Sequence, residues 1–272
     1  MTDNQPTNKP TNPHESRIAH QKTIGIIAGA GPFAGLDLLG KILAHTAAAR
    51  DQDHLTVIGL SRPSQIPDRT AYLLGETAVN PAHAIFEQLR QLAAAGAEVA
   101  AIPCNTAHAP PIYDEITAQL AAAGQPIQFL HLIAETARFV QTHFPGVRMV
   151  GVLSTTGTRQ AGIYPHWLEP AGLRVVLPAA DVQTAVHRAI YDPEQGIKAT
   201  GSGTAAARAW LAAGLRDVAQ QGAEAVILGC TEIPLALTEP VWEGRLLIDP
   251  AVALARALIR EAAPHKLKVW GA

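Results

Sequence analysis

The sequence predicts an α/β fold of two pseudo-symmetric lobes, each a parallel sheet flanked by helices. Short aliphatic segments alternate with longer amphipathic segments rich in Ala and Leu, which is the pattern of parallel strands joined by crossover helices. An internal repeat points to two lobes. Gly96 to Cys104 reads GAEVAAIPC, and Gly222 to Cys230 reads GAEAVILGC.

The repeat keeps one register along the chain. At the same offset of 126 residues, Gly25 matches Gly151 and Gly31 matches Gly157. Self-similarity at a fixed spacing is the mark of a duplicated structural unit. The two cysteines of the chain therefore occupy matching positions in its two halves.

The elements of the first half follow from this alternation. β-branched and aliphatic runs predict strands, and Ala/Leu-rich runs with helical periodicity predict the helices between them. We expect strands at 23–28, 55–60, 99–103 and 127–130. We expect helices at 34–49, 81–95, 111–123 and 133–142.

The second half repeats the scheme after Phe144-Pro145-Gly146, which breaks the helical pattern and serves as a hinge. We expect strands at 148–153, 174–177, 225–228 and 246–248. We expect helices at 162–169, 180–191, 203–221 and 250–262.

These segments divide the chain into three parts. Residues 1–22 are polar, rich in Pro and Asn and without a hydrophobic stretch, so we expect a disordered tail and no signal peptide. Residues 23–143 form the first lobe with Cys104, and residues 147–265 form the second lobe with Cys230.

Composition limits the partners. The chain has 272 residues, 48% of them hydrophobic, and a formal net charge of −2, which provides no general attraction for nucleic acid or an anionic membrane. No apolar run reaches the roughly 20 residues of a membrane span. Two cysteines form no disulfide framework, and reduced thiols suit a cytoplasmic protein. We expect a small-molecule partner.

Both cysteines directly follow a predicted strand, where α/β sheets bind ligands. Each precedes a polar segment that could open a helix, whose N-terminus would favour a carboxylate and a thiolate. Thiols on opposite faces of one Cα could remove a proton from one side and deliver one to the other. A single buried cysteine more often only packs, and a redox disulfide is also open, but the duplication favours paired chemistry.

Six segments together resemble the aspartate/glutamate racemase family, especially its aspartate racemase branch. They are IGIIAGAGP (24–32), QIPDRT (65–70), PCNTAH (103–108), STTGT (154–158), GIK (196–198) and GCTEIP (229–234). The resemblance implies a racemase that needs no cofactor, acts on an acidic amino acid and assembles as a homodimer. It makes Cys104 and Cys230 the acid/base pair, one for each enantiomer.

The resemblance also implies the substrate contacts. The side-chain carboxylate of the substrate is assigned to Arg69 and Lys198, and the charge-assisted pairing that Arg offers a carboxylate agrees with this. The remaining assigned residues bind the α-carboxylate and the ammonium: Asn105, Thr106, the backbone of Ala107, Thr231 and Glu232. Simple solvation of Lys198 and a helix-dipole contact of Glu232 are the competing explanations for these two residues. No spacing typical of a metal site occurs in the sequence.

The sequence leaves the substrate and the exact activity open. Ala30 stands where the family usually has Met, which leaves substrate size undecided. Gly29, Gly31 and Gly35, with Ser61-Arg62 after the second strand, form a loose NADP-binding pattern that would fit an oxidoreductase. The paired cysteines would also fit a glutamate or broad-specificity racemase, a hydantoin racemase, a maleate isomerase or a catalytically silent amino-acid-binding protein.

Overall fold

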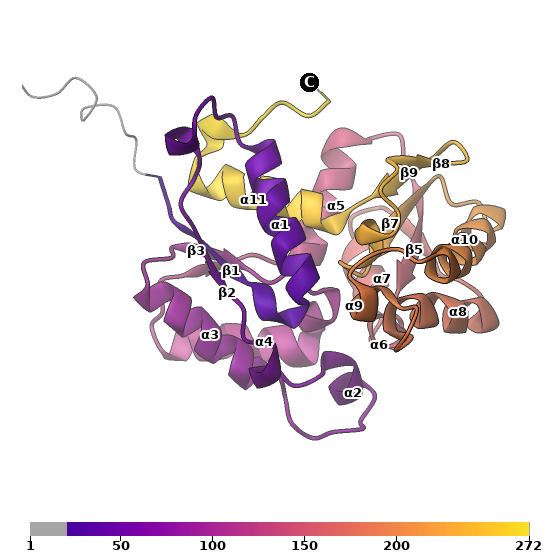
Figure 1. Ribbon diagram of the computed structural model, residues 1–272, viewed down its shortest axis with the longest axis horizontal. Coiled ribbons are helices and arrows are strands. Elements are labelled where there is room, and N and C mark those ends of the chain that lie inside the picture. The colour runs from indigo at the N-terminus through magenta and orange to yellow at the C-terminus, as the bar shows by residue number, and fades with distance from the viewer. Residues whose placement is uncertain (1–20, 272) are drawn as a thin grey trace, which may run out of the picture.

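The computed structural model describes residues 21–271 and has two sheets side by side, the first parallel and the second parallel except for its edge strand (Figure 1). Residues 1–20 of the predicted tail lie outside the described residues. Lys22 donates its backbone N–H to the carbonyl of Ala262 at 3.1 Å. The first described residues are therefore hydrogen-bonded to the last residue of the helix Pro250–Ala262. The predicted α/β class with two lobes is confirmed.

The first sheet has the strand order β2-β1-β3-β4, and all its pairs are parallel. Its strands are β1 (Ile24–Ile27), β2 (Val57–Leu60), β3 (Val99–Ala101) and β4 (Gln128–Phe129). β1 and β3 are buried throughout, because helices cover both faces of the sheet.

The second sheet repeats this order as β6-β5-β7-β9 and adds β8 at the edge. Its strands are β5 (Met149–Ser154), β6 (Arg174–Val176), β7 (Ala225–Gly229), β8 (Val241–Trp242) and β9 (Arg245–Ile248). β8 is antiparallel to β9 and was not predicted. The turn between them places Glu243 at φ 45° and Gly244 at φ 79°, a conformation suited to a tight two-residue hairpin.

One pair of equivalent glycines, Gly25 and Gly151, supports the duplication. A Cβ on Gly25 would lie 3.0 Å from the Cβ of Ala97, and a Cβ on Gly151 would lie 3.3 Å from the Cβ of Ala223. Ala97 and Ala223 are themselves 126 residues apart. Each half thus repeats the same close approach between its first strand and the segment leading into its third.

Helices form three layers around the sheets (Figure 1). α3 (Ala82–Ala94) and α4 (Pro110–Ala122) cover the outer face of the first sheet, and α8 (Ala180–Tyr191) and α10 (Ala205–Gln220) cover the outer face of the second. The middle layer is α1 (Pro32–His45), α5 (Leu132–His143), α7 (Ile163–Leu168) and α11 (Pro250–Ala262). Three short helices complete the set: α2 (Arg69–Leu73), α6 (Thr156–Gln160) and α9 (Ile197–Thr200).

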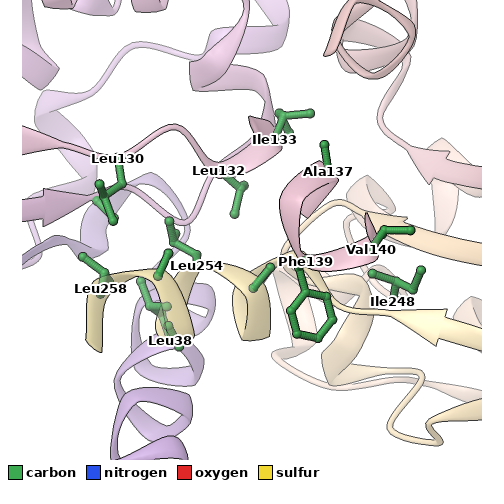
Figure 2. Packing of buried hydrophobic residues seen from close by; sticks show 14 of the residues in the cluster. Leu38, Leu130, Leu132, Ile133, Ala137, Phe139, Val140, Ile248, Leu254 and Leu258 are labelled. Carbon is green, nitrogen blue, oxygen red and sulfur yellow. The ribbon is translucent and has the colours of Figure 1, made fainter. Parts of the chain in front are cut away.

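The middle layer contains one core shared by both halves of the chain. α11 comes from the second half but packs on α1, α5 and β3 of the first. Figure 2 shows Leu254 and Leu258 of α11 near Leu38 of α1 and Leu130. The predicted lobe boundary at residues 144–146 stays a prediction, while the helix packing crosses it.

The structure corrects several predicted helices. The first ends at His45 rather than at residue 49, because Thr46 pairs with Leu267 of the C-terminal segment. The stretch expected at 162–169 is α7, and it is separated by Gly162 at φ 60° from the unpredicted α6. Among residues 21–271, we find no helix that combines the length and the apolar character needed to cross a membrane.

Candidate functional site

The segments that carry the two cysteines lie against each other. Thr231, directly after Cys230, donates its hydroxyl to the carbonyl of Pro103, directly before Cys104, at 2.7 Å. This hydrogen bond is buried and joins residues 128 positions apart. The segments that follow β3 and β7 therefore lie side by side.

A second contact joins the halves one turn further on. The hydroxyl oxygens of Thr106 and Thr158 lie 3.2 Å apart, and Thr158 also accepts a hydrogen bond from Thr155 at 3.1 Å. Thr155 is the N-cap of α6 and accepts the backbone N–H of Thr158. This capping explains why the STTGT segment turns toward the first cysteine segment.

The polar segment that could open a helix after each cysteine forms a short 3-10 helix instead. Residues Asn105–His108 follow Cys104, and α4 begins only at Pro110. Residues Ile233–Leu235 follow Cys230, and no α-helix continues from them. The predicted helix dipole beside each thiol is therefore wrong, and side chains set the local charge instead.

Arg69 supplies that charge for Cys104. Arg69 opens α2, which is capped by Asp68, and its guanidinium donates to the carbonyl of Ala30 at 2.9 Å. Burial lowers the pKa of Arg69, but charge and hydrogen-bond interactions with Cys104 outweigh burial and raise it. Cys104 is 6% exposed, so this cation faces the thiol in a largely dry environment.

The neighbour of Cys230 is a carboxylate rather than a cation. Its Sγ donates to Oε2 of Glu232 at 2.9 Å, and Glu232 is paired with Lys198. The pKa of Cys230 is raised well above its usual value, first by burial and then by the Glu232 carboxylate, with Lys198 opposing. This thiol is held protonated.

The repeat itself explains the difference between the two thiols. Thr106 and Glu232 are equivalent at the 126-residue offset, so the first half has a hydroxyl where the second has a carboxylate. Glu232 is 3% exposed and fits only because Gly31 is nearby. A Cβ on Gly31 would lie 2.5 Å from Oε1 of Glu232.

Asn105 has a buried partner that the sequence did not reveal. Tyr164 of α7 is 1% exposed and donates its hydroxyl to Oδ1 of Asn105 at 2.7 Å. Burial, together with the nearby Cys230 and Asp249, raises the pKa of Tyr164 well above its usual value. Within the described chain, Nδ2 of Asn105 is buried and has no hydrogen-bond partner, so it is a donor available to a ligand.

Tyr191 is a second residue that the sequence analysis missed. Nζ of Lys198 lies 5.4 Å from its ring centroid, and its phenol interacts electrostatically with Arg69 and Cys230. Burial raises the pKa of Tyr191 to about 12, and Lys198 partly offsets the effect. Its place at the end of the amphipathic α8, seven residues before Lys198, was the available signal.

Two residues beside Cys104 have structural roles. The backbone N–H of Ala107, predicted to bind the substrate, is donated to the carbonyl of Cys104 at 3.2 Å. His108 is fully buried, and its Nδ1 lies 2.9 Å from the same carbonyl. Its ring packs beside His131, and burial lowers the pKa of His108 to about 4, so it is a neutral packing residue at neutral pH.

The glycines of the loose nucleotide-binding pattern have packing reasons of their own. A Cβ on Gly29 would lie 2.7 Å from the backbone nitrogen of Arg62, and one on Gly35 would lie 2.5 Å from the Cβ of Ala28. With Gly31 against Glu232, each glycine of the pattern is needed where the chain passes close to another segment.

A duplicated α/β fold with one cysteine after the third strand of each half defines the class of this protein: a two-lobed α/β protein with paired thiol segments. Residues 27–258 match the family model described as Asp/Glu/Hydantoin racemase. The chain belongs to that racemase family, and the resemblance seen in the sequence is confirmed.

Similarity to individual racemases agrees with the family assignment. The chain is 27% identical over 241 residues to the "Broad specificity amino-acid racemase RacX" of Bacillus subtilis, a match that covers 87% of this chain and 96% of that protein. It is 28% identical to the solved aspartate racemase of Picrophilus torridus, with a TM-score of 0.71 and coverage of 89% and 94%. Glutamate racemase from Francisella tularensis, at 18% identity, a TM-score of 0.62 and coverage of 93% and 85%, shares the fold.

Proposed function

We propose that this protein racemises an acidic amino acid, aspartate in the first place, by exchanging a proton between Cα and two cysteines without pyridoxal phosphate. The observation that carries the proposal is the buried hydrogen bond from Thr231 to Pro103, which joins the two cysteine segments. The similarity to an aspartate racemase at 28% identity supports the choice of substrate.

The unlike surroundings of the thiols suit opposite roles in one direction of the reaction. Cys104, beside the Arg69 cation, acts as the base and takes the proton from Cα, leaving the C–H electron pair on the substrate. Cys230, which is protonated beside Glu232, then gives its proton to the other face. The enzyme ends with a thiol at Cys104 and a thiolate at Cys230, which is the starting state for the opposite enantiomer.

The charged groups suit a dicarboxylate substrate. The α-carboxylate accepts from the partnerless Nδ2 of Asn105. The distal carboxylate approaches Arg69 and Lys198, and the substrate ammonium takes the place of Lys198 beside Glu232. The cations of Arg69 and Lys198 then stabilise the negative charge that develops at Cα when the proton leaves, in a site from which most water is excluded.

One observation favours a second candidate, a racemase of broader specificity. Lys198 is already neutralised by Glu232, which leaves Arg69 as the cation for a distal group, and Ala30 keeps the neighbouring side chain small. The relative from Bacillus subtilis is named as a broad-specificity enzyme. A chain of this design would also accept neutral amino acids.

The test is proton exchange in D2O without added cofactor. L- and D-aspartate, L- and D-glutamate and L-alanine are incubated separately, with Cα–H loss followed by NMR and enantiomers by chiral chromatography. We expect exchange with inversion for aspartate. Inversion of alanine at a comparable rate would select the broad-specificity candidate.

The variants Cys104→Ser and Cys230→Ser separate the two thiols. We expect each to lose racemisation while keeping its fold, measured by circular dichroism. The matched control Thr117→Ser changes a partly exposed hydroxyl residue on α4 and leaves the rate unchanged. A folded protein that exchanges no Cα–H in any of these amino acids would refute the proposal.

A further inference from the structure

A second pocket lies between α5 and α11, outside the cysteine site. Its volume is about 370 Å³, within the range of small-molecule sites. α11 provides the small residues Ala253 and Ala257, which leave space between the helices, and Phe139 and Leu267 add apolar wall. The polar lining is mostly basic: Arg138, Arg256, Arg260, His143, Thr142 and the one acid Glu135.

Arg256 is the unusual member of this lining. Its side chain is buried, with the residue only 7% exposed, yet no carboxylate of residues 21–271 forms an ion pair with it. Its neighbours are Nδ1 of His45 at 3.4 Å and the ring of Trp270, whose centroid lies 5.2 Å from the guanidinium. Buried charges in proteins are normally paired, but within residues 21–271 the Arg256 guanidinium has no carboxylate partner.

The other charges do not supply that partner. Arg260 forms a bidentate ion pair with Glu135, with distances of 2.9 and 3.0 Å. Arg260 also pairs with Glu261 at 3.0 Å. Arg138 is exposed on α5 and adds a further positive charge at the mouth. Among the described residues that line it, the pocket therefore has an excess of positive charge.

The positive charge of Arg256 also affects the pKa values of two neighbouring histidines. The pKa of His143 is lowered by burial and then by Arg256. The pKa of His45 is lowered by burial and then by Arg256 and Lys268. For both histidines burial is the larger cause of the lowered pKa, and the Arg256 cation adds a second contribution that a bound anion would oppose.

We infer that the pocket between α5 and α11 binds an organic anion, with its phosphate or carboxylate head on Arg256 and Arg138 and its apolar part against Phe139 and Leu267. The guanidinium fork offers two parallel hydrogen bonds to such a head group. Because the pocket joins a helix of each half of the chain, its ligand fastens the two halves together.

The test uses the full chain with phenyl phosphate and 3-phenylpropionate as probes. Binding is followed by saturation-transfer NMR in the presence of saturating aspartate, which blocks anion binding at the cysteine site. Benzyl alcohol and benzylammonium are the neutral and cationic comparisons. We expect saturable binding of at least one of the two anions, and this binding should weaken when salt is added. Benzyl alcohol and benzylammonium should not bind.

The variants are Arg256→Met, which keeps the packing of the stem, and Arg138→Gln at an exposed position. We expect at least tenfold weaker binding in the first and severalfold in the second, with Arg256→Lys intermediate. Arg90→Gln on α3 is the surface control and binds as the parent does. Arg69→Gln, which changes the cysteine site, also retains binding.

Three outcomes would overturn the inference: absence of saturable binding by either anion, undiminished binding in both Arg256→Met and Arg138→Gln, or loss of binding in Arg69→Gln. The last would mean that the probe occupies the cysteine site. Thermal unfolding of each variant shows whether it is folded, and Arg138→Gln keeps the test decisive if Arg256→Met is not.

Discussion

The Sγ of Cys230 lies 2.9 Å from Oε2 of Glu232, and Glu232 in turn pairs with Lys198. The equivalent thiol, Cys104, interacts with the cation of Arg69 instead. The duplication therefore preserves the position of the sulfur atoms while the side chains around them differ in sign. The following predictions depend on this site and on the packing around it.

Replacing Glu232 with Gln lowers the pKa of the Cys230 thiol. The substitution keeps an oxygen that accepts the thiol proton but removes the negative charge, and it leaves the Lys198 cation uncompensated beside the sulfur. Iodoacetamide labelling of Cys230 across pH, read by peptide mass spectrometry, measures the change. Glu239→Gln, an exposed acid in the same segment, is the control. A labelling midpoint that does not move downward would contradict this role of Glu232.

Gly31→Ala disrupts the Glu232–Lys198 pair. The new methyl group would lie 2.5 Å from the Glu232 carboxylate, at a backbone φ of 155° that side chains rarely adopt. Turnover and stability both fall. Gly40→Ala in the middle of α1 meets no atom within 4 Å and stabilises the helix by about 0.5–1 kcal/mol. Urea unfolding compares the two, and equal stabilities would refute the argument.

Gly151→Ala destabilises more than Gly25→Ala at the equivalent position. The added Cβ would lie 2.6 Å from Cγ2 of Val218 in the second half but 3.0 Å from the Cβ of Ala97 in the first. Overpacking of this kind costs roughly 1–3 kcal/mol. Adding Val218→Ala to Gly151→Ala removes the contact with Cγ2 but leaves the one with Cβ at 2.8 Å, so a double-mutant cycle in urea shows favourable coupling with partial recovery of stability. If the changes in unfolding free energy of the two substitutions simply add, Val218 is not the residue that Gly151→Ala overpacks.

Acid destabilises the fold through His108 and His131. Burial lowers the pKa of His108 to about 4, and burial and then His108 lower that of His131 to about 2. Between these values and the unfolded pKa near 6.5, the unfolded chain binds more protons than the folded one. Stability is therefore fully present above pH ~6.5 and falls below it, by up to about 1.4 kcal/mol per pH unit for each histidine.

The variant His131→Asn tests this assignment. Nδ1 of His131 accepts the backbone N–H of Ala134 at the start of α5, and Asn is a good N-cap that does not titrate. Urea unfolding between pH 7.5 and pH 5 should show a shallower loss of stability for the variant. His83→Asn, at an exposed position on α3, should leave the slope unchanged. Parallel slopes for His131→Asn and the parent would exclude His131.

Much of the fold follows from local sequence. All eight predicted strands occur, since buried aliphatic runs between turn residues are a strong signal in parallel sheets. β8 was missed because Val241 and Trp242 are not part of a longer aliphatic run, whereas the equally short β4 lies within the run from Ile127 to Leu130. The short helices α2 and α6 were missed for the same reason, although their N-caps Asp68 and Thr155 are visible in the sequence.

The site follows less completely, because its contacts come from long-range packing. Cys104, Cys230 and Arg69 could be named from motifs, but the pairing of Lys198 with Glu232 depends on the placement of α9, which packs on α8, relative to the segment after β7. Tyr164 and Tyr191 carry no motif at all. Their roles depend on neighbours far away in the sequence: Asn105 lies 59 residues from Tyr164, and Arg69 belongs to the other half of the chain from Tyr191.

The position of α11 bears on how the chain acquires its fold during synthesis. The first sheet needs α11 to cover β3 and pack on α1, yet α11 begins only at Pro250. A nascent chain that has emerged as far as the second cysteine still exposes the apolar surface of the first half to the cellular milieu. Maturation of the amino-terminal half is therefore coupled to the last stage of translation, and truncation before residue 250 would yield an aggregation-prone species.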